Sequence, residues 1–222
     1  MLQDLLHLFF PVTCICCENI LHNNEEHLCI SCLECLPVLD EKQDPIVQKL
    51  AGRIRAHHSY SFLKFNKKGM AQKLLHELKY NRNPELGLYL GSLLAESLQK
   101  SGATWEIDCL VPVPLHPKRL AQRGYNQAEQ IAKGISEKLG IPVNTSILSK
   151  VKENQSQTKK GRLARIVNLK DCYEAKKGTV KEEMKIALVD DVITTGATFE
   201  ACAIALEKAS LPKLSVVAFA VA

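Results

Sequence analysis

The sequence has no long hydrophobic segment. No apolar run in its 222 residues reaches the ~20 residues that a membrane-spanning helix needs. The apolar start, residues 1–11, carries Asp4 where a signal peptide would have basic residues, and no small-residue cleavage site follows it, so we expect a short amphipathic helix there. These absences predict a cytoplasmic protein without a membrane span, whose nine cysteines are not expected to form disulfides.

Aromatic residues are also scarce, at 5% of the chain with one tryptophan. Proteins that bind single-stranded nucleic acid stack its bases on aromatic side chains set among basic ones, and the sequence contains no obvious stretch of this kind. The charge is unevenly distributed, however, with a net −7 in residues 1–44 and a net +12 in the remainder. The larger part therefore favours polyanions, either phosphorylated small molecules or nucleic acid, although a solvated lysine-rich surface has the same composition.

Six of the nine cysteines lie between positions 14 and 35. They include two C-x-x-C pairs, and each such turn aims two sulfurs at one point, so that two turns complete a tetrahedron around zinc. The segment is acidic and poor in apolar residues, so metal binding would supply its folding free energy. We expect a zinc-binding module at residues 1–44 with a closed structural site made by Cys14, Cys17, Cys29 and Cys32.

The sequence leaves open which residues are the metal ligands. Cys16, Cys35, His22 and His27 lie near enough in the chain to substitute for one of the four cysteines. Buried thiols without a metal are the structural alternative. A redox role is disfavoured, because no βαβ pattern adjoins either pair.

Residues 45–222 predict an α/β domain, and residues 36–53 are expected to form the connector that leads into it. Short apolar or alternating segments predict strands, and apolar residues at helical spacing predict helices between them. The expected strands are 57–65, 109–113, 185–190 and 213–222, and the expected helices include 74–78, 86–98, 123–139 and 199–209.

A stiff, irregular loop is expected after the strand at 109–113, because three prolines in this region prevent regular pairing. Rigid loops with cations at the carboxyl end of a strand are well placed to hold phosphate or pyrophosphate in an open α/β sheet. A proline-rich surface turn is the alternative. The candidate side chains of this loop and the helix after it are His116, Lys118, Arg119, Arg123 and Asn126.

Residues 150–165 are polar, basic and poor in core residues. Such a stretch predicts a flexible loop, and a basic loop beside an anion site can act as a lid over it. An idle surface loop fits the same composition. The residues that would contact an anion are Lys159, Lys160 and Arg162.

The stretch IALVDDVITTGAT, residues 186–198, begins as a buried strand and ends in a polar turn before the helix at 199–209. Helix N-termini carry unpaired N–H groups and a partial positive charge, so the turn suits a phosphate. Asp190 and Asp191 would repel a phosphate but would accept hydrogen bonds from hydroxyls or hold Mg²⁺. A ligand with a phosphate at one end and vicinal hydroxyls near it is a ribose 5-phosphate.

This stretch resembles the signature of the type I phosphoribosyltransferases: four apolar residues, two acids, two apolar residues, then T-T-G-A-T. The resemblance implies a Rossmann-like parallel sheet. It also implies that Asp190 and Asp191 hold the ribose hydroxyls of phosphoribosyl pyrophosphate (PRPP), with Mg²⁺, and that the turn holds the 5-phosphate. The residues of that turn are Thr194, Thr195, Gly196, Ala197 and Thr198.

Along nearly its whole length the chain is similar to the ComF family of competence-associated proteins, ComFC-like members in particular. The similarity rests on the four-cysteine finger, on LKYNRNPELGLYLG, on VPVPLHPKRLAQRGYNQAEQIA and on the acid and threonine stretch. It implies that VPVPLHPKR is the pyrophosphate loop and that residues around 152–165 form the flexible loop. No dedicated nucleophile stands out, and the acceptor of a phosphoribosyl group is not readable from the sequence. A non-catalytic protein that handles incoming single-stranded DNA beside a helicase-like partner is the alternative.

Overall fold

The computed structural model describes residues 11–39, 45–102, 105–152 and 171–222. The main body is a sheet of four strands in the order β1-β6-β5-β2, and every neighbouring pair is parallel. The strands are β1 (Ala56–Lys64), β2 (Cys109–Pro112), β5 (Lys185–Ile193) and β6 (Lys213–Val221). The central strands are apolar because both faces of the sheet are covered, and the predicted parallel α/β fold is confirmed.

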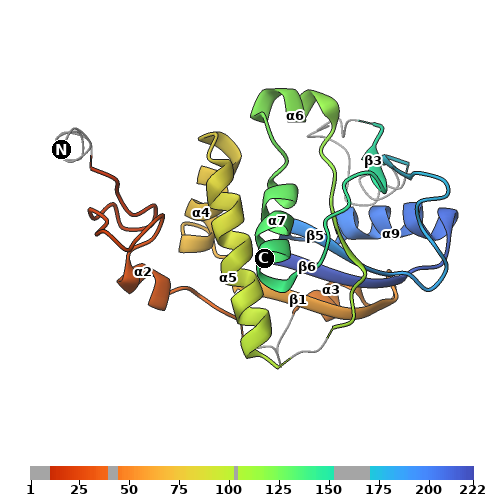
Figure 1. Cartoon of the computed structure of the whole chain (residues 1–222), viewed down its shortest axis with the longest axis horizontal. Helices are drawn as coiled ribbons and strands as arrows, with labels where there is room; N and C mark the ends of the chain where they lie inside the picture. The colour runs from red at the N-terminus through yellow and green to blue at the C-terminus, as the bar shows by residue number, and fades with distance from the viewer. Residues whose placement is uncertain (1–10, 40–44, 103–104, 153–170) are drawn as a thin grey trace.

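Helices lie on both faces of the sheet (Figure 1). One face packs against α4 (Met70–Tyr80), α5 (Pro84–Lys100) and α7 (Gln127–Leu139), and the other against α9 (Ala197–Ala209). Helices α5 and α7 cross at their glycines: a Cβ on Gly91 would lie 2.1 Å from the Ile131 carbonyl oxygen, and one on Gly134 would lie 2.0 Å from that of Leu88. This close approach fixes the position of α7, whose first turn lies at the carboxyl end of the sheet.

Two predicted loops contain helices. The expected connector at 36–53 includes α3 (Pro45–Leu50), which forms because Ile46 and Leu50, at i and i+4 spacing, bury their side chains together. The prediction of an irregular loop after β2 is wrong for residues 117–123, which form α6 (Pro117–Arg123). Proline is well tolerated in the first turn of a helix, and the His116 side chain caps this one by accepting from the Lys118 N–H.

A short antiparallel ribbon of β3 (Leu148–Lys150) and β4 (Tyr173–Ala175) lies next to α9. The predicted flexible loop runs between these two strands, and its candidate residues Lys159, Lys160 and Arg162 lie outside the described residues, as does the N-terminal segment 1–10. The helix α2 (Ile30–Glu34) belongs to the cysteine-rich segment. None of the helices in the described ranges is long and apolar enough to cross a membrane.

Candidate functional site

The two acids both lie within β5. The sequence predicted that this strand ends at Asp190, but β5 continues to Ile193 because Val192 and Ile193 pair with Ala220 and Val221 of β6. Successive side chains of a strand point to opposite faces, so the adjacent carboxylates face different layers of the protein.

Asp191 faces the layer of α4, α5 and α7. It is 8% exposed, and its Oδ2 lies 2.6 Å from the Nζ of Lys79 at the end of α4. A buried carboxylate needs such a partner, because an unpaired charge is costly away from water. Lys79 was not among the candidate residues from the sequence. Its only signal was its place in the LKYNRNPELG stretch.

Asp190 faces the layer of α9 and the β3–β4 ribbon. Burial and the negative charge of Asp191 raise the pKa of the half-buried Asp190 carboxyl to about 8, although the Asp191 N–H, 2.8 Å from its Oδ1, and the cations Lys79 and Lys150 favour the ionised form. Asp190 therefore carries a proton near neutral pH.

Lys150 is a second cation that the sequence did not single out. Its Nζ lies 2.9 Å from the hydroxyl of Tyr173, and burial, followed by the nearby Arg119, lowers its pKa. Asp190 and Arg119 also act on Tyr173, whose pKa burial raises strongly. The predicted Arg119 thus lies close to the Asp190 side of β5.

The threonine and glycine turn connects β5 directly to α9. Gly196 adopts a left-handed conformation, with φ of +76°, and the helix begins at the next residue. The hydroxyls of Thr194 and Thr195 lie on exposed residues, while Gly196 is buried. This arrangement leaves the turn accessible on its outer side, at the N-terminus of a helix of 13 residues.

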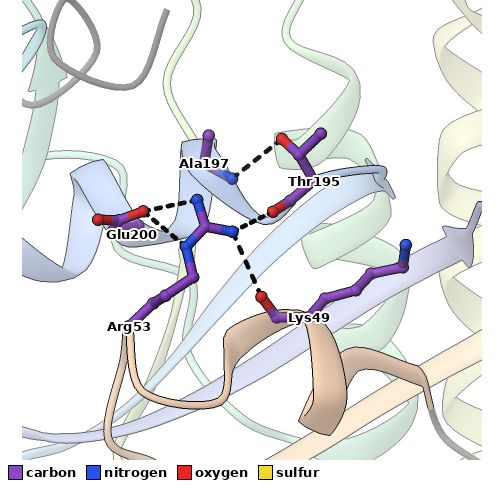
Figure 2. A network of polar contacts seen from close by, with 5 residues as sticks. All are labelled: Lys49, Arg53, Thr195, Ala197 and Glu200. Atoms are coloured by element: carbon purple, nitrogen blue, oxygen red, sulfur yellow. Dashed lines mark hydrogen bonds and ion pairs between the residues drawn. The ribbon is translucent and has the colours of Figure 1, made fainter. Parts of the chain in front are cut away.

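Arg53 contacts this turn from the side on which α3 lies (Figure 2). It lies just after α3 and bridges three parts of the chain: its Nε and Nη2 lie 2.9 and 2.7 Å from Oε2 of Glu200, and its Nη1 donates to the carbonyl oxygens of Lys49, at 3.3 Å, and Thr195. Arg53 was not among the candidate residues from the sequence, because nothing in the local pattern links it to residues about 140 positions away.

The candidate cations around α6 separate into two groups. Lys118 and Arg119 are exposed on the helix, and His116 caps it through Nδ1, 3.3 Å from the Lys118 nitrogen. Arg123 turns toward α4 instead, where its guanidinium lies 5.8 Å from the ring centre of Tyr80. The four predicted cations are therefore close in the chain, but they contact different parts of the protein.

The RGYNQA stretch, residues 123–128, ties three elements to this edge of the sheet. The hydroxyl of Tyr125 donates to the Leu78 carbonyl of α4, and the Asn126 amide donates to the Val113 carbonyl after β2, at 3.0 Å. Arg123 donates to the Gln127 side-chain oxygen at 2.7 Å. The amide nitrogen of Gln127 is buried without a hydrogen-bond partner in the part of the chain that the structure describes. A donor in that state is available to a ligand oxygen.

The four predicted cysteines form one cluster. The sulfurs of Cys14, Cys17, Cys29 and Cys32 all lie within 4.8 Å of one another, so they could hold a metal ion, and four thiolates in this arrangement suit zinc. Of the alternative ligands from the sequence, Cys16, Cys35, His22 and His27, none belongs to the cluster in the described residues.

Two of those alternatives have other environments. Burial raises the pKa of Cys16 to about 11, which keeps its thiol protonated, and the His27 ring packs edge-on against Tyr89 of α5, with centroids 5.2 Å apart. The ammonium of Lys73 on α4 donates to the Cys16 carbonyl at 2.6 Å. The cysteine-rich segment is therefore docked on α4 and α5, and Cys14 and Cys29 are buried in the same hydrophobic cluster as the leucines of α4.

We expect purified protein to contain one zinc ion per chain, and Cys14→Ser to lose it. Because the segment packs into the main hydrophobic cluster, Cys14→Ser should also lower the melting temperature. The matched control is Cys35→Ser, an exposed cysteine outside the cluster, which should keep both properties. Metal analysis together with a thermal melt tests this. Wild-type protein without zinc would contradict the assignment.

The raised pKa of Asp190 predicts how the folding stability changes with pH, and the direction of that change can be measured. The folded state holds this proton up to about pH 8, whereas an unfolded aspartate releases it near pH 4, so folding stability should fall as pH rises through that window. Asp190→Asn removes this decline and should be more stable than wild type at pH 8. Urea unfolding at about pH 5.5 and pH 8 measures the difference, and equal pH dependence in both proteins would show that Asp190 titrates normally.

No model of a known protein family matches the chain. Competence protein F of Haemophilus influenzae is 28% identical over 233 residues, which cover 94% of this chain and 96% of that protein. Competence protein ComFC of Bacillus subtilis is 36% identical over 107 residues, 48% of this chain and 41% of the relative. The DNA utilization protein YhgH of Escherichia coli K12 is 29% identical over 128 residues, 56% of each chain. The chain thus matches about half of the length of the last two.

Among solved structures, adenine phosphoribosyltransferase from Leishmania tarentolae aligns with a TM-score of 0.39 and 11% identity, over 73% of this chain and 91% of that one. A score at this level establishes no shared fold, so the architecture rests on the parallel sheet described above. The similarity to competence protein F spans nearly both chains, and the cysteine cluster lies where the family resemblance places it. Along nearly its whole length the chain is thus similar to competence protein F, in agreement with its resemblance to the ComF family.

Proposed function

We propose that the chain binds PRPP with Mg²⁺ and transfers or recognises its 5-phosphoribosyl group. The observation that carries this proposal is the position of Asp190 and Asp191 on β5, directly before a glycine turn at the N-terminus of α9. Ligands of open parallel sheets bind outside the carboxyl ends of the strands. Acids for hydroxyls and a helix N-terminus for phosphate meet there within a few residues.

Each part of PRPP has a matching group. The 5-phosphate would take the N–H groups and hydroxyls of residues 194–198, and the ribose hydroxyls would donate to Asp190 and Asp191. Lys79 would shift from Asp191 as the hydroxyls arrive. Lys118, Arg119 and Lys150 offer positive charge for the pyrophosphate, and the loop residues Lys159, Lys160 and Arg162 remain predicted contributors outside the described part of the chain.

Mg²⁺ fits this site because the two acids offer the hard oxygen ligands that it prefers, and when bound it screens the charge of the pyrophosphate. The protein's own contribution to a transfer would be positioning of the ribose and stabilisation of the leaving pyrophosphate. The described site contains no side chain placed as a nucleophile, and none is needed. The acceptor is not specified by the site.

A second function, the handling of single-stranded DNA during competence, is supported by a different observation. One relative is named for competence and another for DNA utilization. In the structure two aromatic rings and a cation also lie together on the surface. Tyr80 is 64% exposed, the ring centre of His76 lies 4.7 Å from that of Tyr80, and the guanidinium of Arg123 lies over the Tyr80 ring. Such groups can stack bases. A helicase-like partner belongs to this second proposal.

The double variant Asp190→Asn/Asp191→Asn should lose Mg²⁺-dependent PRPP binding by roughly a hundredfold or more, since the acceptors for the ribose hydroxyls and the carboxylate ligands for Mg²⁺ are removed. It should keep its zinc and its circular dichroism spectrum. Glu183→Gln, just before the opposite end of β5, which begins at Lys185, is the control and should bind normally. Calorimetry with PRPP and Mg²⁺ measures the affinity. Binding by the double variant that equals the wild type would refute the assignment of the acids.

If the chain binds single-stranded DNA through Tyr80, Tyr80→Ala should weaken binding of a short oligothymidylate about fivefold or more, whereas Tyr80→Phe should keep it. Affinity should also fall steeply between low and moderate salt, because phosphate contacts release counterions. Gel-shift titrations at two salt concentrations test both points. Salt-independent binding, or equal affinity of Tyr80→Ala and wild type, would contradict this second function.

A further inference from the structure

We propose that Arg53 is a positioning residue for the turn at 194–198: it holds the peptide bond between Thr195 and Gly196 in the orientation that presents the Gly196 N–H to a bound phosphate. The role of the turn as a phosphate site rests on the proposed function above. The contacts of Arg53 do not, since they are made within the protein (Figure 2).

The guanidinium of Arg53 is held on two sides. Nε and Nη2 lie 2.9 and 2.7 Å from Glu200 Oε2, and Glu200 is only 8% exposed in the first turn of α9. Nη1 donates to the carbonyl oxygens of Lys49 and Thr195. A planar group with donors on several edges can satisfy these directions at once, whereas a lysine ammonium is a single point on a flexible stem.

The contact with the Thr195 carbonyl fixes the direction of a neighbouring donor. The Thr195 carbonyl and the Gly196 N–H belong to one planar trans peptide unit, so they point in opposite directions. With the oxygen bound to Arg53, the Gly196 N–H is directed away from Arg53 and from α3. If this peptide flipped, the carbonyl oxygen would take the place of the N–H and would repel an anion.

The peptide between Thr195 and Gly196 can flip more easily than most, because glycine accepts many backbone conformations. Gly196 cannot be replaced to prevent it: its φ is +76°, and an added Cβ would lie 2.7 Å from Cδ2 of Leu50. The left-handed backbone and the close packing against α3 together favour glycine, and glycine leaves the peptide free to rotate. Arg53 supplies the restraint that a side chain at position 196 would otherwise provide.

The test compares Arg53→Lys with wild type, and with Arg55→Lys, which makes the same chemical change at an exposed position two residues away. In the ligand-free protein, the Gly196 amide resonance in a ¹⁵N–¹H spectrum should broaden or split in Arg53→Lys only. In calorimetry at a temperature well below unfolding, the affinity for PRPP with Mg²⁺ should fall about tenfold or more.

Glu200→Gln should change the affinity in the same direction by less, and the double variant Arg53→Lys/Glu200→Gln should fall short of the sum of the two effects, since both residues act through one contact. An unchanged Gly196 resonance together with unchanged affinity in Arg53→Lys would overturn the inference. A lower melting temperature would not rescue it, because a loss of stability alone is what a purely structural ion pair between Arg53 and Glu200 predicts. If wild type itself binds no PRPP, the proposed function fails, and the Gly196 resonance still decides the role of Arg53.

Discussion

The arrangement of this protein depends on how it accommodates two adjacent carboxylates in a strand that is buried on both faces. Strand geometry sends Asp190 and Asp191 into different layers, and each layer meets its carboxylate in a different way. Lys79 pairs with Asp191 at 2.6 Å, while Asp190 keeps a proton near neutral pH because burial and its neighbour disfavour its charge. A buried acid pair is costly to the ligand-free protein, and under the proposed function a ligand that offers hydroxyls or a cation would offset that cost.

The elements around the acids are connected to them through few, specific contacts. The α4 helix carries Lys79 at its end and Lys73 near its start, and Lys73 binds the carbonyl of Cys16 in the cysteine-rich segment. The segment with the cysteine cluster is therefore docked on the helix that supplies the partner of Asp191 in the candidate site. On the opposite face, α3 and Arg53 support the turn before α9. The division at residue 44 remains a prediction, because residues 40–44 lie outside the described part of the chain.

The sequence predicted what depends on local spacing. The parallel strands, the four clustered cysteines and the acids before a glycine turn could all be read from residues close to one another in the chain. It did not predict Lys79, Lys150 or Arg53, because each acts on residues that only the fold brings near. The helix α6 was missed for the opposite reason: proline suggests irregular structure in general, but it is favourable in a helix's first turn once His116 provides the cap. Charge and motif thus point to the candidate site, and tertiary packing decides which cations lie beside it.

The central claim is that the end of β5 and the turn after it receive one ligand with hydroxyls on one side and a phosphate on the other. A crystal structure of the protein with PRPP and Mg²⁺ tests it most directly. The account predicts ribose hydroxyls within hydrogen-bond distance of Asp190 and Asp191, the 5-phosphate on the amides of residues 195–198, and Arg53 still bound to the Thr195 carbonyl. Ligand density at another surface, with Lys79 still on Asp191 and the turn empty at saturating ligand, would contradict it.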